Sequence, residues 1–244
     1  MKYYQMHEQV YKGLQNNGFV SWDKEKDPEN LWSHQINQSL KKCLDEEGIN
    51  LKNLNILDLG TGTGTCALFC AKEGAKCTGV DISKTAINMA RANNDYFKFS
   101  AEFLEADILN LEMNKKFDLI TDSSLLHCLV GSDDRRKFYE VIKSHLADTG
   151  LVFLHTMVSS NDMSSLLEND YLHLEGETLY SLGIEDINQG RILFEGKSYF
   201  PHRSILRLGN LLSEIRMAGL EVVSSTIVSN PGDPDNFIAL LRSN

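Results

Sequence analysis

The sequence lacks an apolar run long enough to cross a membrane. A membrane-spanning helix needs about 20 consecutive, mostly apolar residues, and even the stretch Leu151 to Val158 is interrupted by His155. The first ten residues include Lys2, His7 and Glu8 and hold no continuous apolar segment, so we expect no signal peptide there. These absences predict a cytoplasmic protein with no membrane partner.

Positive charge is also scarce. The chain has 24 lysines and arginines against 34 aspartates and glutamates, which gives a formal net charge of −10. An acidic surface repels phosphate backbones. The basic groups Arg135-Arg136-Lys137 and Arg203 with Arg207 are short and flanked by acids, so we interpret them as solvated helix faces or an anion clamp. We therefore predict no nucleic-acid partner.

Cysteine is present only in an odd and scattered set. There are five, and without paired spacing we expect reduced thiols in a cytoplasm. Cys66 and Cys70 lie one helical turn apart but lack a second Cys/His pair, which favours small buried apolar side chains over a metal site. His127 and His155, without a clear carboxylate, are also a poor ligand set. No metal is predicted.

From Asn53 onward, short apolar strands alternate with helices. This alternation predicts an α/β fold with a Rossmann-like, doubly wound, mostly parallel sheet of seven strands and helices on both faces. The expected strands are 55–59, 75–80, 101–104, 117–121, 151–155, 221–228 and 237–241, and the expected helices are 64–73, 83–94, 133–146 and 205–218.

Two segments fall outside this alternation. Residues 1–50 predict an N-terminal helical cap, with a helix from about Pro28 to Glu47 that ends at Gly48. Residues 51–244 form the main domain, and within it the segment 157–203 is too long for an ordinary connection. We expect this insertion to be a lid over a ligand site.

The strongest local signal is the run Asp58-Leu59-Gly60-Thr61-Gly62-Thr63-Gly64. Alternate glycines after a strand permit a tight turn and let a ligand lie against bare backbone, at the start of a helix whose free amides suit an anion. A second acid, Asp81, ends the next strand, where a carboxylate can accept hydrogen bonds from both ribose hydroxyls. Nicotinamide cofactors and other adenosine-containing cofactors both satisfy these two features.

The order of further motifs resembles the class I S-adenosylmethionine-dependent methyltransferases, over roughly residues 54–156. The stretch Asp122 to Leu129, with the pattern Asp-x-x-x-Leu-His-Cys-Leu, is similar to the small-molecule branch that includes thiopurine and tellurite methyltransferases. The resemblance implies S-adenosylmethionine as the cofactor, with S-adenosylhomocysteine as its product. The cofactor-binding residues that it implies are Asp58, Gly60, Thr61, Gly62, Gly64, Asp81, Ile82, Asp107, Ile108, Asp122, Ser123 and His127.

Residues for the acceptor are less well marked. His127 and His155 follow the fourth and fifth strands, where a general base could act, although each could equally be a structural histidine. Trp22, Tyr199 and Arg203 are candidate substrate-binding residues. Trp22 could instead pack a helix against the sheet, and Arg203 could be an ordinary surface or ion-paired arginine.

These features predict a methyltransferase that moves the methyl group of S-adenosylmethionine to a small-molecule acceptor by in-line displacement. One alternative is a regulatory module that binds the same cofactor without transfer. A nicotinamide-dependent oxidoreductase is the other. The acceptor atom (oxygen, nitrogen, sulfur or carbon) and the oligomeric state stay open.

Overall fold

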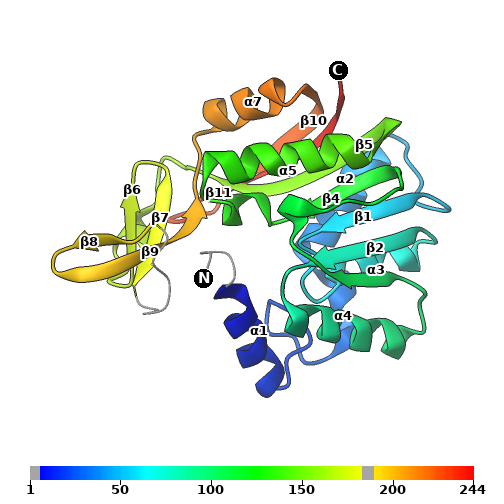
Figure 1. The fold of residues 1–244 in the computed structure, drawn as a ribbon, viewed down its shortest axis with the longest axis horizontal. Coiled ribbons are helices and arrows are strands. Elements are labelled where there is room, and N and C mark those ends of the chain that lie inside the picture. Colours follow the sequence, from blue (N-terminus) through cyan, green and yellow to red (C-terminus); the bar gives the residue numbers. More distant parts are fainter. Residues whose placement is uncertain (1–5, 183–189) are drawn as a thin grey trace.

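A seven-stranded sheet forms the centre of the molecule. The computed structural model describes residues 6–182 and 190–244, and its main sheet has the order β10-β11-β5-β4-β1-β2-β3 (Figure 1). Within this sheet, β11 is the one strand that runs in the direction opposite to the others, so it is antiparallel to both β10 and β5. The strands are β1 (Asn55–Leu59), β2 (Lys76–Asp81), β3 (Glu102–Glu105), β4 (Phe117–Ser123), β5 (Leu146–Val158), β10 (Leu220–Val228) and β11 (Asp235–Ser243).

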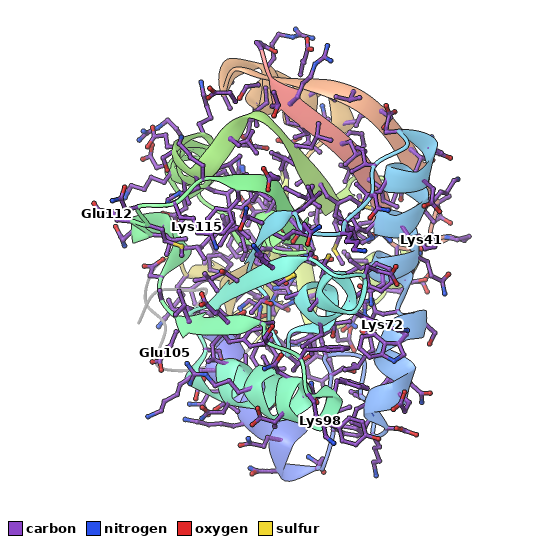
Figure 2. The ribbon with its side chains drawn as sticks, turned by 90° about the vertical axis from the view of Figure 1, so that its right-hand side faces the viewer. Lys41, Lys72, Lys98, Glu105, Glu112 and Lys115 are labelled. Atoms are coloured by element: carbon purple, nitrogen blue, oxygen red, sulfur yellow. The ribbon has the colours of Figure 1, made fainter. Side chains whose placement is uncertain are left out.

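Helices cover both faces of this sheet, which confirms the predicted doubly wound fold. Alternating side chains of β1 point to opposite faces: Ile56 packs with α2, α3 and α4, whereas Leu57 and Leu59 pack with α5 and α7. Figure 2 shows the labelled lysines and glutamates on the outside of these layers. The helices are α2 (Gln35–Glu46), α3 (Thr65–Lys72), α4 (Lys84–Phe97), α5 (Ser132–His145) and α7 (Leu208–Met217).

The strand order creates a switch point between β1 and β4. From β1 the chain proceeds to β2 and β3 on one side, then returns to β4 and β5 on the other. The connections that leave the carboxyl ends of β1 and β4 therefore diverge, and a crevice opens there. In this fold the crevice at the switch point is where a ligand binds.

The N-terminal region is tied to the β2–α4 turn. Helix α1 (His7–Asn16) packs on α4 through Tyr11, Leu14 and their neighbours. Its Glu8 carboxylate accepts hydrogen bonds from Ser83 Oγ (2.6 Å) and Thr85 Oγ1 (2.8 Å) at the start of α4. This contact brings α1 beside the carboxyl end of β2. Residues 1–5 of the predicted cap lie outside the described residues.

The sequence predicted a single helix over residues 28–47. This prediction was wrong in one respect, because the segment forms two helices. A 3₁₀ helix, η2 (Pro28–Ser33), ends at His34, whose backbone is extended, and α2 begins after it. The His34 ring Nδ1 accepts the Ile36 amide (3.2 Å) and so caps α2. The residue whose side chain caps a helix has a non-helical backbone, which explains the break at His34.

The insertion after β5 folds as a second, four-stranded antiparallel sheet of order β6-β7-β9-β8. Its small core contains Leu166, Leu179 and Ile205. β5 runs to Val158, past the predicted end at 155, because it pairs with β11 over its whole second half. Residues 183–189 of the predicted lid lie outside the described part. The elements are α6 (Ser164–Leu167), β6 (Leu172–Glu175), β7 (Thr178–Leu182), β8 (Ile192–Phe194) and β9 (Lys197–Ser204).

Within residues 6–182 and 190–244, none of the helices combines the length and the apolar character needed to cross a membrane.

Candidate active site

A cavity of about 370 Å³ lies at the carboxyl ends of β1, β2, β4 and β5. The glycine loop forms its floor, and α1, the start of α2 and β9 close over it. Most residues that the sequence predicted for a cofactor line this cavity. They are Gly60, Thr61, Gly62, Asp81, Ile82, Asp107, Ile108, Ser123 and His127, together with the predicted acceptor-site residues Trp22, His155 and Arg203.

The glycine loop has no room for side chains. Gly60 and Gly62 have positive φ (69° and 53°), a region that side chains disfavour. A Cβ atom on Gly60 would lie 2.8 Å from Leu125 Cβ, and one on Gly62 would lie 2.6 Å from the Tyr11 hydroxyl oxygen. The loop therefore presents bare backbone to whatever occupies the cavity.

Asp81, at the end of β2, fixes the position of this loop. One carboxylate oxygen accepts the Gly62 amide (2.9 Å), and the other accepts the Ser83 amide (2.8 Å). Burial raises the pKa of Asp81, against the hydrogen bonds from Ser83 and Gly62, which lower it. Each carboxylate oxygen has a second lone pair, and Asp81 lines the cavity. It can accept further hydrogen bonds from a diol such as a ribose.

Three predicted cofactor residues do not line the cavity. Asp58 is fully buried and accepts hydrogen bonds from Thr61 Oγ1 (2.6 Å) and Thr121 Oγ1 (2.7 Å), so it joins the glycine loop to β4. Asp122 is also fully buried and accepts the Leu125 amide (2.7 Å). Gly64 faces Phe103 and Ala90. These residues shape the loops, because their polar groups are used inside the protein.

Asp107 lies at the other end of the cavity, after β3. It caps the short 3₁₀ helix η3 (Ile108–Asn110), since its Oδ1 accepts the Leu109 amide (3.0 Å). Together with the apolar side chains of Ile82 and Ile108 it lines the wall. An acid beside two apolar side chains suits a purine ring with an exocyclic amine.

His127 presents a hydrogen-bond donor to its surroundings. It lies in η4 (Leu126–Cys128), after β4, and is 5% exposed. The backbone N–H of Met157 donates to its Nδ1 (3.3 Å). Burial lowers the pKa of His127, so the ring is neutral and its proton lies on Nε2. A ring in this tautomer can donate at Nε2, and the side chain of His127 also forms a hydrogen bond with Cys128.

His155 lies in β5 and also lines the cavity. Its Nδ1 is 3.0 Å from Ser124 Oγ, and its buried Nε2 has no hydrogen-bond partner. Burial lowers the pKa of His155 to about 4. When Nδ1–H donates to Ser124, Nε2 offers a lone pair. The two histidines that the sequence treated alike therefore have different chemistry.

Cys128 is a site residue that sequence reasoning missed. It lines the cavity, and its thiol donates to the Ser124 carbonyl oxygen (3.4 Å). Burial raises the pKa of Cys128, but the nearby Arg203 guanidinium and His127 ring outweigh it and lower the pKa to about 7. The position of Cys128 directly after His127 was the available signal in the sequence. The proximity of Arg203 to Cys128 could not be predicted, because the two residues are far apart in the chain.

Iodoacetamide is expected to alkylate Cys128 at a rate that rises from pH 6 to 8 and reaches half its maximum near pH 7. The thiolate is the nucleophile, and an ordinary cysteine reaches this point at about pH 8.5. Peptide mass spectrometry gives the rate for each cysteine. Cys43, whose pKa burial raises, is the internal control and should react more slowly at every pH. A midpoint of Cys128 above pH 8.5 contradicts the prediction.

The structure separates the three candidate substrate residues. Trp22 lies at the mouth, 40% exposed, with its ring 5.3 Å from that of Tyr11. Arg203 is 9% exposed and lines the cavity. Tyr199 is not among the described residues that line the cavity. It packs in the small sheet, where its hydroxyl donates to the Asp170 carbonyl oxygen (3.4 Å).

Other lining residues were not among the predicted site residues. They include Tyr11 and His7 of α1, the pair His34 and Asp23, and Asn236 of β11. No group of three or more histidines, cysteines, aspartates or glutamates suited to a metal ion occurs among the described residues.

Comparison with known proteins identifies the domain. The model of a family described as "Methyltransferase domain" matches residues 56–150, which run from β1 into β5. Over these residues the chain is similar to that methyltransferase domain family. A protein of Geobacillus sp. (strain WCH70), named as a methyltransferase, is 33% identical over 121 residues, which cover 48% of this chain and 47% of that protein. The chain thus spans about half the length of this curated relative.

Solved methyltransferase structures share the fold over nearly the whole chain. An S-adenosylmethionine-dependent methyltransferase from Clostridium acetobutylicum ATCC 824 has a TM-score of 0.65 at 18% identity and covers 96% of this chain and 99% of its own. Magnesium protoporphyrin IX methyltransferase from Synechocystis PCC 6803, solved with bound S-adenosylhomocysteine, has a TM-score of 0.66 at 15% identity, with coverage of 98% and 97%. The methyltransferase fold therefore includes the small sheet and α1.

Proposed function

We propose that this methyltransferase transfers the methyl group of S-adenosylmethionine to a small-molecule acceptor. The observation that carries the proposal is the cavity at the β1/β4 switch point, where bare glycine backbone faces Asp81. The methyltransferase family match and the small-molecule enzyme among the similar structures support it. The net charge of −10 argues against a nucleic-acid acceptor.

The residues present fit this cofactor. Asp81 has lone pairs for the ribose hydroxyls, and Asp107 with Ile82 and Ile108 suits the adenine ring. Gly60 and Gly62 line the cavity and carry no side chains of their own, so the amino-acid end of the cofactor can lie against their backbone. S-adenosylmethionine supplies a methyl group that the positive sulfonium already activates. The protein therefore needs to align the acceptor, exclude water and remove a proton.

We infer that His155, and not His127, receives the proton. His127 Nδ1 is held by the Met157 amide, so its ring donates. His155 Nε2 is unpartnered and can accept a hydrogen bond from an acceptor O–H, S–H or N–H. A hydroxyl or thiol proton becomes strongly acidic as its oxygen or sulfur gains the methyl group, so even a base with a pKa of about 4 can then take it.

All five cysteines are free. This observation supports our further proposal that the protein works in a reducing compartment such as the cytoplasm.

Calorimetric titration with S-adenosylhomocysteine and with NAD⁺ tests the cofactor, and release of S-adenosylhomocysteine in a screen of acceptors tests the transfer. We expect S-adenosylhomocysteine to bind and NAD⁺ not to bind. Binding without any product across acceptors would favour a regulatory module. Tight binding of NAD⁺ alone would overturn the proposal.

With an acceptor from that screen, His155→Ala is expected to slow methyl transfer at least about tenfold, with the affinity for S-adenosylhomocysteine unchanged. His155→Gln keeps an acceptor oxygen and should retain more activity. Because the pKa of His155 is lowered to about 4, the ring takes up a proton only below that pH. Its ionisation should therefore cause no loss of rate between pH 8 and pH 6. An inflection near pH 6.5 that disappears in His155→Ala contradicts this assignment.

A further inference from the structure

Two arginines, Arg135 and Arg203, are buried, and their hydrogen-bond and ion-pair partners differ. Arg135 of α5 is 6% exposed and Arg203 of β9 is 9% exposed. A buried guanidinium is costly unless an anion and hydrogen-bond acceptors compensate its charge. The partners of each arginine therefore show whether its charge is balanced inside the protein.

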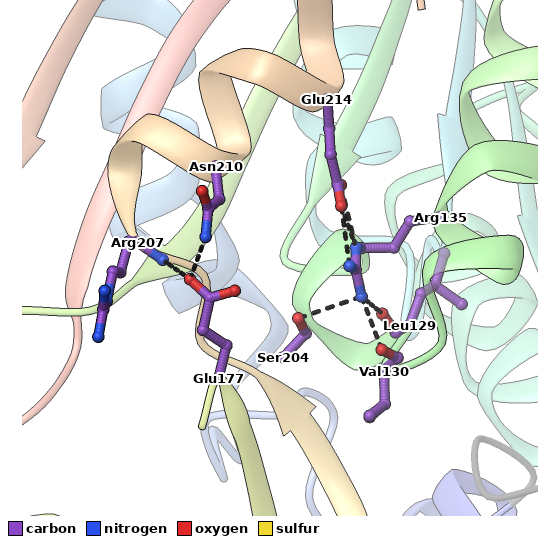
Figure 3. A network of polar contacts seen from close by, with 8 residues as sticks. All are labelled: Leu129, Val130, Arg135, Glu177, Ser204, Arg207, Asn210 and Glu214. Carbon is purple, nitrogen blue, oxygen red and sulfur yellow. Dashed lines mark hydrogen bonds and ion pairs between the residues drawn. The ribbon is translucent and has the colours of Figure 1, made fainter. Parts of the chain in front are cut away.

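The charge of Arg135 is fully compensated (Figure 3). Two of its nitrogens form a bidentate pair with Glu214 (Nη2 to Oε1 2.8 Å, Nε to Oε2 3.0 Å). Its third nitrogen donates to the carbonyl oxygens of Val130 (2.6 Å) and Leu129 (3.2 Å) and to Ser204 Oγ (3.3 Å). The sequence interpretation of Arg135 as part of a solvated face or an anion clamp was therefore wrong, whereas its neighbours Arg136 and Lys137 are exposed.

Arg203, adjacent to Ser204, has no such anion among the described residues. Its Nη1 donates to the His202 carbonyl oxygen (2.8 Å) and lies 3.3 Å from His7 Nε2. Within the part of the chain that the structure describes, no carboxylate forms an ion pair with it, and Nε and Nη2 have no hydrogen-bond partner. The fork of Nε and Nη2, the edge that grips Glu214 in Arg135, is unused in Arg203. A carboxylate can bind such an edge through two parallel hydrogen bonds.

Arg203, which carries this unused Nε/Nη2 edge, lines the cavity. β9 packs against η4, and the charge of Arg203 acts on His127 and Cys128, which follow β4. Among the lining residues described, Arg203 is the one lysine or arginine. A single guanidinium, without a second cation, suits a singly charged carboxylate better than a doubly charged phosphate.

We propose that Arg203 binds a carboxylate of the acceptor, so the substrate class is a small carboxylic acid whose nucleophilic group faces His155. This inference rests on the proposed methyltransferase function. The bound carboxylate supplies the anion that Arg203 lacks, while His155 on β5 receives the hydrogen bond of the group to be methylated. The two contacts together orient the acceptor.

Benzoate and its neutral isostere benzamide are suitable probes, because the lining also includes the apolar Leu125, Leu129 and Met157. Each is titrated into the complex with S-adenosylhomocysteine and into the ligand-free protein, by calorimetry or NMR. We expect benzoate to bind at least about tenfold more tightly than benzamide. Arg203→Gln should lose that preference, and Arg203→Lys, which keeps the charge but not the fork, should lie between.

Arg207→Gln is the matched control. Arg207 is exposed, and its hydrogen bond to Glu177 comes from the backbone N–H (2.7 Å). The substitution removes the same charge four residues away and should leave benzoate binding unchanged. Equal binding of benzoate and benzamide to the wild-type protein, or benzoate binding that survives Arg203→Gln, overturns the proposal.

A second arm separates the acceptor from the cofactor, which also carries a carboxylate. S-adenosylhomocysteine and 5′-methylthioadenosine differ by the amino-acid end. We expect Arg203→Gln to leave the affinity for both unchanged. If it weakens S-adenosylhomocysteine alone, Arg203 binds the cofactor and the proposal is wrong. Failure of the wild-type protein to bind S-adenosylhomocysteine contradicts the proposed function instead, while benzoate binding to the ligand-free protein still decides the role of Arg203.

Discussion

Asp81→Ala is expected to weaken the binding of S-adenosylhomocysteine at least about 100-fold, because hydrogen bonds to a charged group contribute roughly 1.5–3 kcal/mol each. The substitution removes the proposed ribose acceptors. It also releases the Gly62 amide (2.9 Å), so the loop loses its fixed position over the cavity. Two effects on one ligand make this the largest change in affinity that we expect from a single residue.

Calorimetry measures the affinity, and two further variants give the comparison. Asp81→Asn keeps the side-chain volume and one acceptor oxygen, so its loss should be intermediate. Asp95→Ala removes the same charge from the exposed side of α4 and should bind normally. Thermal unfolding of each variant checks that the fold is intact. An affinity for Asp81→Ala within about threefold of wild type excludes Asp81 from the ribose site.

The largest effect on stability is expected from Glu214→Ala. It leaves the Arg135 guanidinium buried without its anion, and breaking a buried ion pair costs about 3–5 kcal/mol. For a domain of this size, such a loss lowers Tm by roughly 10 °C. Since Arg135 also holds the Leu129 and Val130 carbonyl oxygens and Ser204, the network connects α5, α7 and β9 (Figure 3).

Circular dichroism during heating gives Tm for Glu214→Ala and for two comparisons. The double variant Arg135→Met/Glu214→Leu removes both charges and should be more stable than Glu214→Ala, because no uncompensated charge stays buried. Glu140→Ala breaks the pair that exposed Arg136 forms with Glu140 (2.7 Å), and this should change Tm little. A fall of less than about 2 °C in Glu214→Ala would show that the buried pair does not stabilise the fold.

Features that depend on neighbouring residues could be predicted from the sequence. Strand β1 and the glycine turn after it follow from an apolar run and from alternate glycines. Asp81 follows from its place at the end of β2. These signals are local, because periodicity and turn geometry are properties of a few consecutive residues. The seven-stranded sheet follows in turn, since alternating strands and helices permit few topologies.

Side-chain partners that are far apart in the chain could not be predicted. Asp58 stands in the expected motif, yet one of its oxygens accepts a hydrogen bond from Thr121 Oγ1, 63 positions away, inside the protein. His127 and His155 occupy equivalent positions after two strands. Their partners distinguish them, because His127 Nδ1 accepts the Met157 amide, whereas His155 contacts Ser124 and has an unpartnered Nε2.

The sequence by itself determined the sheet and the glycine loop, because regular backbone patterns and glycine turns are encoded residue by residue. The tertiary structure decided which charges are balanced. Arg135 meets Glu214 across 79 positions of the chain, whereas Arg203 meets no carboxylate in the described residues and lowers the pKa of Cys128 instead. Burial and electrostatic pairing depend on what folding brings together, so the chemistry of the acceptor site appears only in three dimensions.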